Sequence, residues 1–235
     1  MPEFVYTSRA PYGNSVLPWV LNTRYGMPEK PFVLISKAFT RDECALARKL
    51  SDEDHGPKAT VHLRNGEPGS ELDLRTRDAH VRQVRNLSSI GLGRVWEFAT
   101  REAHYQWELP ADAMATNTGF QLLTYKVGGH YLEHSDNSML ANGKWEIKLR
   151  NRFISVVAFF STHGEHFTGG ALAFPRWKVD GEVVRYLPKA GDLVIFPSGP
   201  QSSHQVEPVT SGVRLSAATW SGRNLSSKGL PRERS

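Results

Sequence analysis

A histidine and an aspartate stand two residues apart at the end of an alternating segment, in the order His134-Ser135-Asp136. Side chains alternate faces along an extended strand, so positions 134 and 136 are expected to project to the same side. There an imidazole nitrogen and a carboxylate oxygen could hold one cation. With His204 as a third, distant ligand, the set has two histidines and one carboxylate, which suits non-haem Fe(II) and leaves coordination positions open.

Two other clusters contain residues of the same types. Residues 52–55 read Asp-Glu-Asp-His, and His163 and His166 stand three apart in a glycine-containing polar turn. Neither lies at the end of an alternating apolar strand, and runs of charge are usually solvated surface. We therefore interpret both clusters as exposed loops and not as metal sites.

The His-x-Asp pair is one of five separated segments whose order is informative. The segments are Tyr125-x-x-Gly128-x-x-Tyr131-x-x-His134-x-Asp136, residues 169–175 (GGALAFP), residues 189–196 (KAGDLVIF), residues 204–209 (HQVEPV), and Arg214-Leu215-Ser216 with Trp220. Together they resemble the prolyl-4-hydroxylase superfamily of 2-oxoglutarate/Fe(II)-dependent oxygenases. The resemblance covers residues 119–221 and is loose before that point.

The resemblance implies a metal site and a reaction. It makes His134, Asp136 and His204 the iron ligands and the catalytic centre, with Fe(II), the cosubstrate 2-oxoglutarate and O₂ required and ascorbate as a supporting reductant. The implied reaction hydroxylates an unactivated C–H bond and releases succinate and CO₂. Related halogenases lack the carboxylate ligand, so the presence of Asp136 favours hydroxylation.

The resemblance also assigns a cosubstrate site. Arg214 would hold the distal carboxylate of 2-oxoglutarate, because a guanidinium fork binds a carboxylate through two hydrogen bonds. Ser216 lies two residues later, on the same face of the strand, and could share that carboxylate. Tyr125 matches a tyrosine that lines the cosubstrate pocket, although a core tyrosine would show the same pattern. Tyr131 and Trp220 are expected in the pocket walls or in plain packing.

The substrate stays open between two classes. The superfamily suggests an amino-acid-like substrate, either a free amino acid or small metabolite, or a prolyl residue in a protein. One alternative is a jelly-roll binding protein without turnover, which predicts an incomplete ligand set. The other is a nucleic-acid-directed oxygenase, suggested by the formal net charge of +5. That class predicts a second arginine soon after His204, whereas Arg223 lies beyond Trp220, so a nucleic-acid partner is not expected.

The pattern of elements predicts one mainly β domain with flanking helices. Short apolar runs separated by turn signals over residues 119–221 favour a sandwich or barrel, which the resemblance narrows to a double-stranded β-helix, a cupin-like jelly roll. Residues 1–118 are expected to supply an N-terminal arm, two helices and a loop, and residues 222–235 a basic tail. The single domain thus spans residues 1–235, with its oligomeric state undetermined.

Two helices and two long connections are predicted outside the strands. Thr40 and Glu43 form a capping-box pattern, so a helix should run to about Leu50 with Cys44, Leu46, Ala47 and Leu50 on its inner side. A second helix should begin at Ser88 or Ser89. Residues 51–84 are interpreted as a loop over the site, in which residues 75–85 could touch substrate, and residues 138–151 as a polar connection.

Composition limits the compartment and the partners. Cys44 is the only cysteine, so an internal disulfide is impossible and a reducing compartment fits. No apolar run reaches membrane-spanning length, and the N-terminus shows no signal-peptide pattern. We therefore expect a cytoplasmic enzyme with a small-molecule or peptide substrate and no membrane association.

Overall fold

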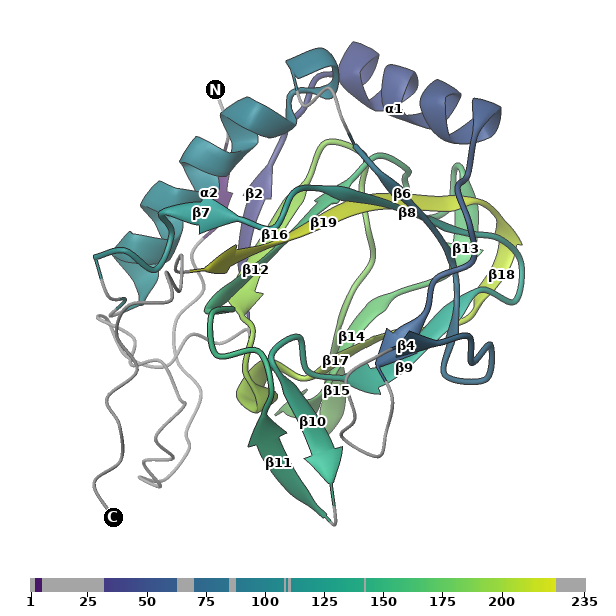
Figure 1. The fold of residues 1–235 in the computed structure, drawn as a ribbon. Coiled ribbons are helices and arrows are strands. Elements are labelled where there is room, and N and C mark those ends of the chain that lie inside the picture. The colour runs from purple at the N-terminus through teal and green to yellow at the C-terminus, as the bar shows by residue number, and fades with distance from the viewer. Residues whose placement is uncertain are drawn as a thin grey trace, which may run out of the picture.

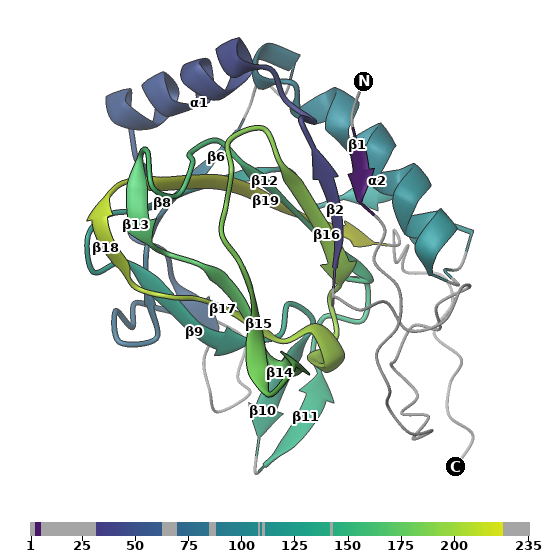
Figure 2. The same ribbon diagram turned by 180° about the vertical axis from the view of Figure 1, so that it is seen from behind.

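Two antiparallel sheets face each other, and two helices cover the outer face of the larger sheet (Figures 1 and 2). This computed structural model describes residues 3–5, 32–62, 70–84, 88–107, 109, 111–141 and 143–222. Apart from residues 3–5, the predicted arm at residues 1–30 lies outside the described residues, as does the predicted tail after residue 222. The expected mainly β jelly-roll architecture is confirmed, while the division of the chain into one domain stays a prediction.

The larger sheet carries the strands that support the helices. Its order is β1 (Glu3–Val5), β2 (Val33–Ser36), β16 (Leu193–Pro197), β12 (Ile154–Phe159), β19 (Arg214–Gly222), β8 (Gln121–Tyr125) and β6 (His80–Gln83), with β7 (Thr116–Asn117) paired to β19. The apolar run that predicted a central strand is therefore β12, which lies between β16 and β19.

The smaller sheet and three two-stranded ladders complete the fold. The smaller sheet has the order β15 (Glu182–Tyr186), β14 (Leu172–Val179), β17 (His204–Val206), β9 (His130–His134) and β5 (Arg77–Asp78). The ladders pair β10 (Ser138–Ala141) with β11 (Lys144–Ile147), β13 (Phe167–Gly169) with β18 (Val209–Gly212), and β3 (Val61–His62) with β4 (Ser70–Glu71). The β10–β11 hairpin projects away from the two sheets (Figure 1).

The helices begin where the sequence places them. Helix α1 (Arg41–Glu53) starts with the predicted capping box, in which the Thr40 hydroxyl accepts from the Glu43 amide and the Glu43 carboxylate accepts from the Thr40 amide. A short 3₁₀ turn, η1 (Ser88–Ile90), precedes α2 (Leu92–Gln106). A second 3₁₀ turn, η2 (Pro200–Ser202), leads into β17.

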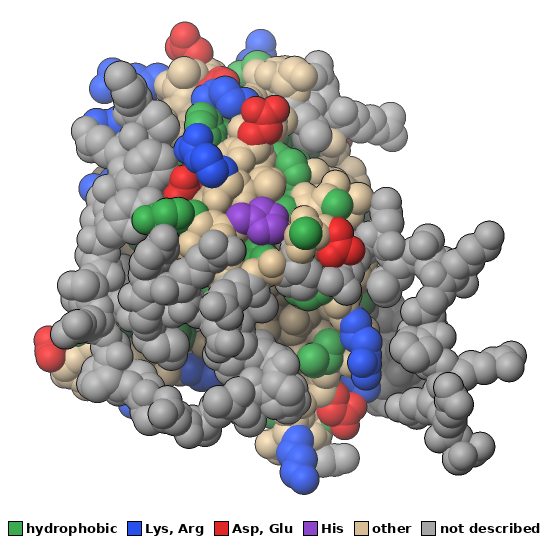
Figure 3. Space-filling model, turned by 90° about the vertical axis from the view of Figure 1, so that its left-hand side faces the viewer, with side chains coloured by type: hydrophobic (Ala, Val, Ile, Leu, Met, Phe, Trp, Pro, Cys, Tyr) green, Lys and Arg blue, Asp and Glu red, His purple; other side chains and the backbone are tan. Residues whose placement is uncertain are grey.

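Two observations concern the surface charge on one face and the helices of the described residues. On the face shown in Figure 3, basic and acidic side chains of the described residues lie among one another. Among these residues, no helix is both long and apolar enough to cross a bilayer.

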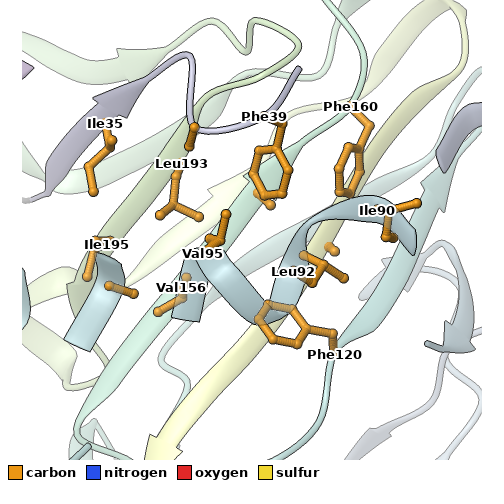
Figure 4. Packing of buried hydrophobic residues seen from close by; sticks show 14 of the residues in the cluster. Ile35, Phe39, Ile90, Leu92, Val95, Phe120, Val156, Phe160, Leu193 and Ile195 are labelled. Carbon is orange, nitrogen blue, oxygen red and sulfur yellow. The ribbon is translucent and has the colours of Figure 1, made fainter. Parts of the chain in front are cut away.

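The main core lies between the helices and the larger sheet. Ile90, Leu92 and Val95 from the α2 region pack against Leu193 and Ile195 of β16 and against neighbouring strands (Figure 4). The α2 stripe that periodicity predicts is thus the packed face. Because this core fills the outer side of the sheet, the space between the two sheets is left for a second cluster and for a cavity.

Three expectations about local structure are wrong. Residues 51–84 are not one loop, because β5 and β6 lie there and pair with β9 and β8 of the two sheets. Residues 138–151 hold the β10–β11 hairpin. Leu46 is 37% exposed, so it does not lie on the inner side of α1, where the predicted Cys44, Ala47 and Leu50 pack together with the buried Ser51. Short polar strands carry little periodicity of their own, and their pairing partners lie far along the chain.

Candidate metal centre and its cavity

Two adjacent strands bring the three predicted ligands together. Strand β17 pairs antiparallel with β9, and His204 lies directly opposite His134 in the register. Asp136 follows two residues after His134, and the ligand atoms of all three residues lie within 4.8 Å of one another. Strand β9 ends at His134, so the prediction that Asp136 shares its strand is wrong; a bend after the strand turns the carboxylate toward the histidines.

Backbone carbonyls fix which nitrogen each histidine offers. The Nδ1 atoms of His134 and His204 lie 2.9 Å from the Leu132 carbonyl oxygen and 3.0 Å from the Ser202 carbonyl oxygen. Because a carbonyl only accepts, Nδ1 must carry the proton and Nε2 is left with a free lone pair. The two Nε2 atoms lie 3.8 Å and 3.7 Å from the Asp136 carboxylate oxygens. Histidine ligands are typically oriented by such a bond on the other ring nitrogen.

Electrostatics set the protonation states of His134 and Asp136. Burial, with His204 next to it, lowers the pKa of His134 to about 3, so its ring is neutral at pH 7. Burial alone would raise the pKa of Asp136. The neighbouring His204 and His134, with hydrogen bonds from Ser155 and Trp220, instead hold that pKa below its ordinary value. His134 is therefore a neutral imidazole and Asp136 a carboxylate, the forms in which these side chains bind a metal.

A serine inside the larger sheet orients the carboxylate. The Ser155 hydroxyl on β12 lies 2.6 Å from Asp136 Oδ2 and 2.8 Å from the Ser198 hydroxyl. The sequence reasoning missed Ser155, although its alternation with Val157 and Phe159 in the apolar strand marks the face that points between the sheets.

Arg214 is buried and has no acidic partner among the described residues. Its side chain is 1% exposed; Nε donates to the Gly170 carbonyl at 2.9 Å and Nη1 to the Ser216 hydroxyl at 3.1 Å. Its guanidinium carbon lies 5.0 Å from the Tyr125 ring centroid and 5.3 Å from that of Phe159. Burial lowers the pKa of Arg214 to about 10, which still leaves it charged at pH 7. No carboxylate of the described residues forms an ion pair with it, and such a buried cation calls for an anion.

A cavity of about 660 Å³ joins these groups. Its lining contains all three ligands and Arg214, and Tyr125, Ser216, Tyr131 and Trp220 as well. The sequence therefore selected residues that the fold brings to one space. The roles assigned to them as ligands and cosubstrate contacts stay predictions.

The donor set fits the metal that the resemblance implies. Two imidazoles and one carboxylate that line one cavity form the donor set typical of non-haem Fe(II), and they would leave coordination positions for other ligands. Within the described part of the chain, this is the one group of three such residues close enough to share an ion. The His163–His166 and residue 52–55 clusters do not form such a group there.

Comparison with known proteins gives a consistent result. Residues 120–222 match the 2OG-Fe(II) oxygenase superfamily. A PKHD-type hydroxylase of Aliarcobacter butzleri is 42% identical over 96 residues, which cover 41% of this chain and 39% of that protein. One from Stutzerimonas stutzeri is 27% identical over 190 residues, covering 79% and 76% of the two chains. The alignments with the first of these relatives thus span about two fifths of the relatives' length.

Solved structures share the fold. A prolyl hydroxylase from Trichoplax adhaerens, in complex with a peptide of a hypoxia-inducible factor, aligns with a TM-score of 0.61 at 17% identity, covering 82% of this chain and 83% of that one. A Pseudomonas putida prolyl-4-hydroxylase aligns with a TM-score of 0.57 at 21% identity, covering 82% and 93%. At these identities the likeness establishes the architecture alone.

Proposed function

We propose that this chain, whose residues 120–222 match the 2OG-Fe(II) oxygenase superfamily, is an Fe(II)- and 2-oxoglutarate-dependent hydroxylase. One observation carries the proposal: three metal-binding side chains and an unpaired buried arginine line the same cavity. A metal site alone would fit many proteins. The arginine adds a place for a dianionic cosubstrate within reach of the metal.

Each residue has a definite task in this proposal. His134 and His204 present Nε2 to the iron, and Asp136 supplies the charged ligand in the orientation set by Ser155. Arg214 binds the distal carboxylate of 2-oxoglutarate. Bound iron with 2-oxoglutarate and O₂ supplies the oxidising power for C–H hydroxylation, with succinate and CO₂ as coproducts.

The protein's own contribution is orientation and exclusion of water. Tyr125 and Phe159 lie about the Arg214 guanidinium, so its charge acts in an apolar surrounding where electrostatic interactions are stronger. Tyr131 stacks on the His134 ring, with centroids 3.5 Å apart, and holds that ligand in place. The substrate C–H bond must be delivered to the remaining open space of the cavity, near the metal.

The substrate that we propose is an amino-acid-like molecule. The relatives are PKHD-type hydroxylases, and the solved neighbours include prolyl hydroxylases, one of them with a bound peptide. These names favour an amino-acid side chain as the target, either in a free molecule or in a protein. The lone cysteine, whose thiol pKa burial raises to about 11, agrees with the prediction of a reducing, cytoplasmic setting.

The test measures binding and turnover separately. Isothermal titration of the protein with Mn(II) and then with 2-oxoglutarate should show both bound, and Fe(II), 2-oxoglutarate, O₂ and ascorbate should yield succinate. A panel of free amino acids and proline-containing peptides should contain a member that stimulates succinate formation. The His204→Ala variant should lose metal binding and turnover, whereas His163→Ala, outside the cavity lining, should retain both. Full activity in His204→Ala would refute the site, and binding without turnover would favour the binding-protein alternative.

A further inference from the structure

Charged side chains in the cavity are predominantly basic. Among the described residues that line it, Lys58, Arg77, Arg152 and Arg214 are cationic, and Asp136 is the one carboxylate. The described lining therefore carries more positive than negative side chains. The question is which of these charges the iron and the cosubstrate already neutralise.

Three of these five charged side chains have a partner, either in the protein or in the proposed metal and cosubstrate. Asp136 faces the metal, Arg214 receives the cosubstrate carboxylate, and the Lys58 ammonium forms an ion pair with Asp78. The charge of Fe(II) offsets that of the 2-oxoglutarate dianion, and Asp136 offsets Arg214. Arg77 and Arg152 are left, and no carboxylate of the described residues forms an ion pair with either. Unbalanced charges in a partly buried site favour a ligand of opposite sign.

Arg152 is fixed close to the metal ligands. Its Nη1 donates to the backbone carbonyl of Asp136 at 3.1 Å, and its guanidinium carbon lies 4.2 Å from the Trp220 ring centroid. Burial lowers the pKa of this guanidinium from its ordinary value, while the nearby Asp136 carboxylate acts in the opposite direction. The guanidinium lies over the indole ring and has N–H donors besides the one bonded to the Asp136 carbonyl.

Arg77 approaches the same space from the smaller sheet. Strand β5 pairs with β9, and the Arg77 guanidinium carbon lies 4.6 Å from the centroid of Tyr131, whose ring stacks on His134. Its Nη1 reaches the Thr60 carbonyl only at 3.4 Å, and its buried Nε has no hydrogen-bond partner among the described residues. A buried donor without a partner is destabilising, and a bound acceptor would supply the missing hydrogen bond.

We propose that Arg77 and Arg152 bind a carboxylate of the primary substrate and so position its C–H bond at the metal. This inference rests on the proposed function and narrows it. A free amino acid or another small carboxylic acid supplies the missing negative charge, whereas a prolyl residue inside a polypeptide does not. Each guanidinium lies over an aromatic ring, and the Arg77 Nε is a buried donor without a partner among the described residues. Guanidinium N–H groups bind a carboxylate through paired hydrogen bonds.

The experiment compares free acids with their uncharged counterparts. The protein is loaded with Mn(II) and 2-oxoglutarate without oxygen, and calorimetry measures the binding of L-proline and a panel of other free amino acids. Each acid is paired with its primary amide. At least one acid should bind roughly tenfold or more tightly than its amide, because the amide cannot pair with two guanidinium groups. Arg77→Gln and Arg152→Gln should each remove this preference, while Arg150→Gln, an exposed arginine outside the lining, should keep it.

Each outcome decides the inference. It is overturned if no free acid of the panel binds the wild-type protein more tightly than its amide, a comparison that depends on no variant folding. It is also overturned if the preference survives in both glutamine variants. Binding of 2-oxoglutarate in the same titrations reports an intact metal and cosubstrate site. If the wild-type protein does not bind 2-oxoglutarate, the proposed function itself is refuted. A failure of the carboxylate inference can therefore be distinguished from a failure of the proposed function.

Discussion

Replacing Ser155 by alanine tests whether the buried serine tunes the metal site. The hydroxyl donates to Asp136 Oδ2 at 2.6 Å, within the range of short hydrogen bonds to a charged acceptor. Its removal takes one oriented donor from the carboxylate and leaves the cavity and the histidines unchanged. We therefore expect weaker metal binding without loss of the fold.

The size of the effect follows from the type of bond. Hydrogen bonds to charged groups contribute about 1.5–3 kcal/mol, which corresponds to roughly 10–100-fold in an equilibrium constant. Removing an outer partner of a metal ligand typically costs a similar factor in affinity. The hydrogen bond from Trp220 to the carboxylate remains, so the lower end, about tenfold, is the expected value.

Metal titration by calorimetry with Mn(II) measures this directly. Ser51→Ala is the matched control. Ser51 lies on helix α1, is as buried as Ser155 at 1% exposure, and its hydroxyl lies 2.8 Å from the Thr124 hydroxyl. Ser51→Ala, like Ser155→Ala, removes one buried hydroxyl and should lower the free energy of unfolding. It should leave the affinity for Mn(II) unchanged. If Ser155→Ala binds Mn(II) as tightly as the wild-type protein, the serine does not orient the ligand and the reasoning is refuted.

Three further predictions concern the cosubstrate cradle and the buried thiol. Arg214→Lys should weaken 2-oxoglutarate binding roughly tenfold or more with little change in Mn(II) affinity, because one charge-assisted bond of the fork is lost; equal affinity in a 2-oxoglutarate titration would contradict the assignment. Gly170→Ala should lower both Tm and 2-oxoglutarate affinity, because Gly170 has φ +60° and a Cβ there would lie 3.0 Å from Arg214 Cδ; a variant with unchanged melting and cosubstrate titration curves would count against this packing. Cys44 should resist a thiol reagent at pH 8 in the native protein and react once it is unfolded, because burial raises its pKa to about 11 and the thiol stays protonated; rapid native labelling would show that the thiol is accessible.

Local sequence signals were sufficient for several elements. The capping box at Thr40 and Glu43 starts α1 as predicted, since the two hydrogen bonds involve residues only three apart. The mostly apolar run of residues 154–159 is the central strand β12, as predicted, because a strand that is buried on both faces is made largely of apolar residues. For the site, the ordered motifs identified the three ligands, Arg214 and Ser216, which the fold gathers about one cavity.

Other features depended on partners far along the chain. Strands β5 and β6 are short and polar, and only their pairing with β9 and β8 makes them strands. Asp136 reaches the histidines through a bend after β9 rather than through strand alternation. In both cases the conformation is set by long-range pairing, which a local pattern does not encode.

The sequence by itself determined the chemistry that is available: two histidines, one aspartate and one arginine in an order typical of an oxygenase. The tertiary structure decided their surroundings, including the carbonyls that fix the histidine tautomers and the serine that holds the carboxylate. It also placed Arg77 and Arg152 on one cavity, although 75 residues separate them. Motifs record which groups are present, whereas burial, hydrogen bonding and unbalanced charge arise only when distant strands pair and the sheets close around the site.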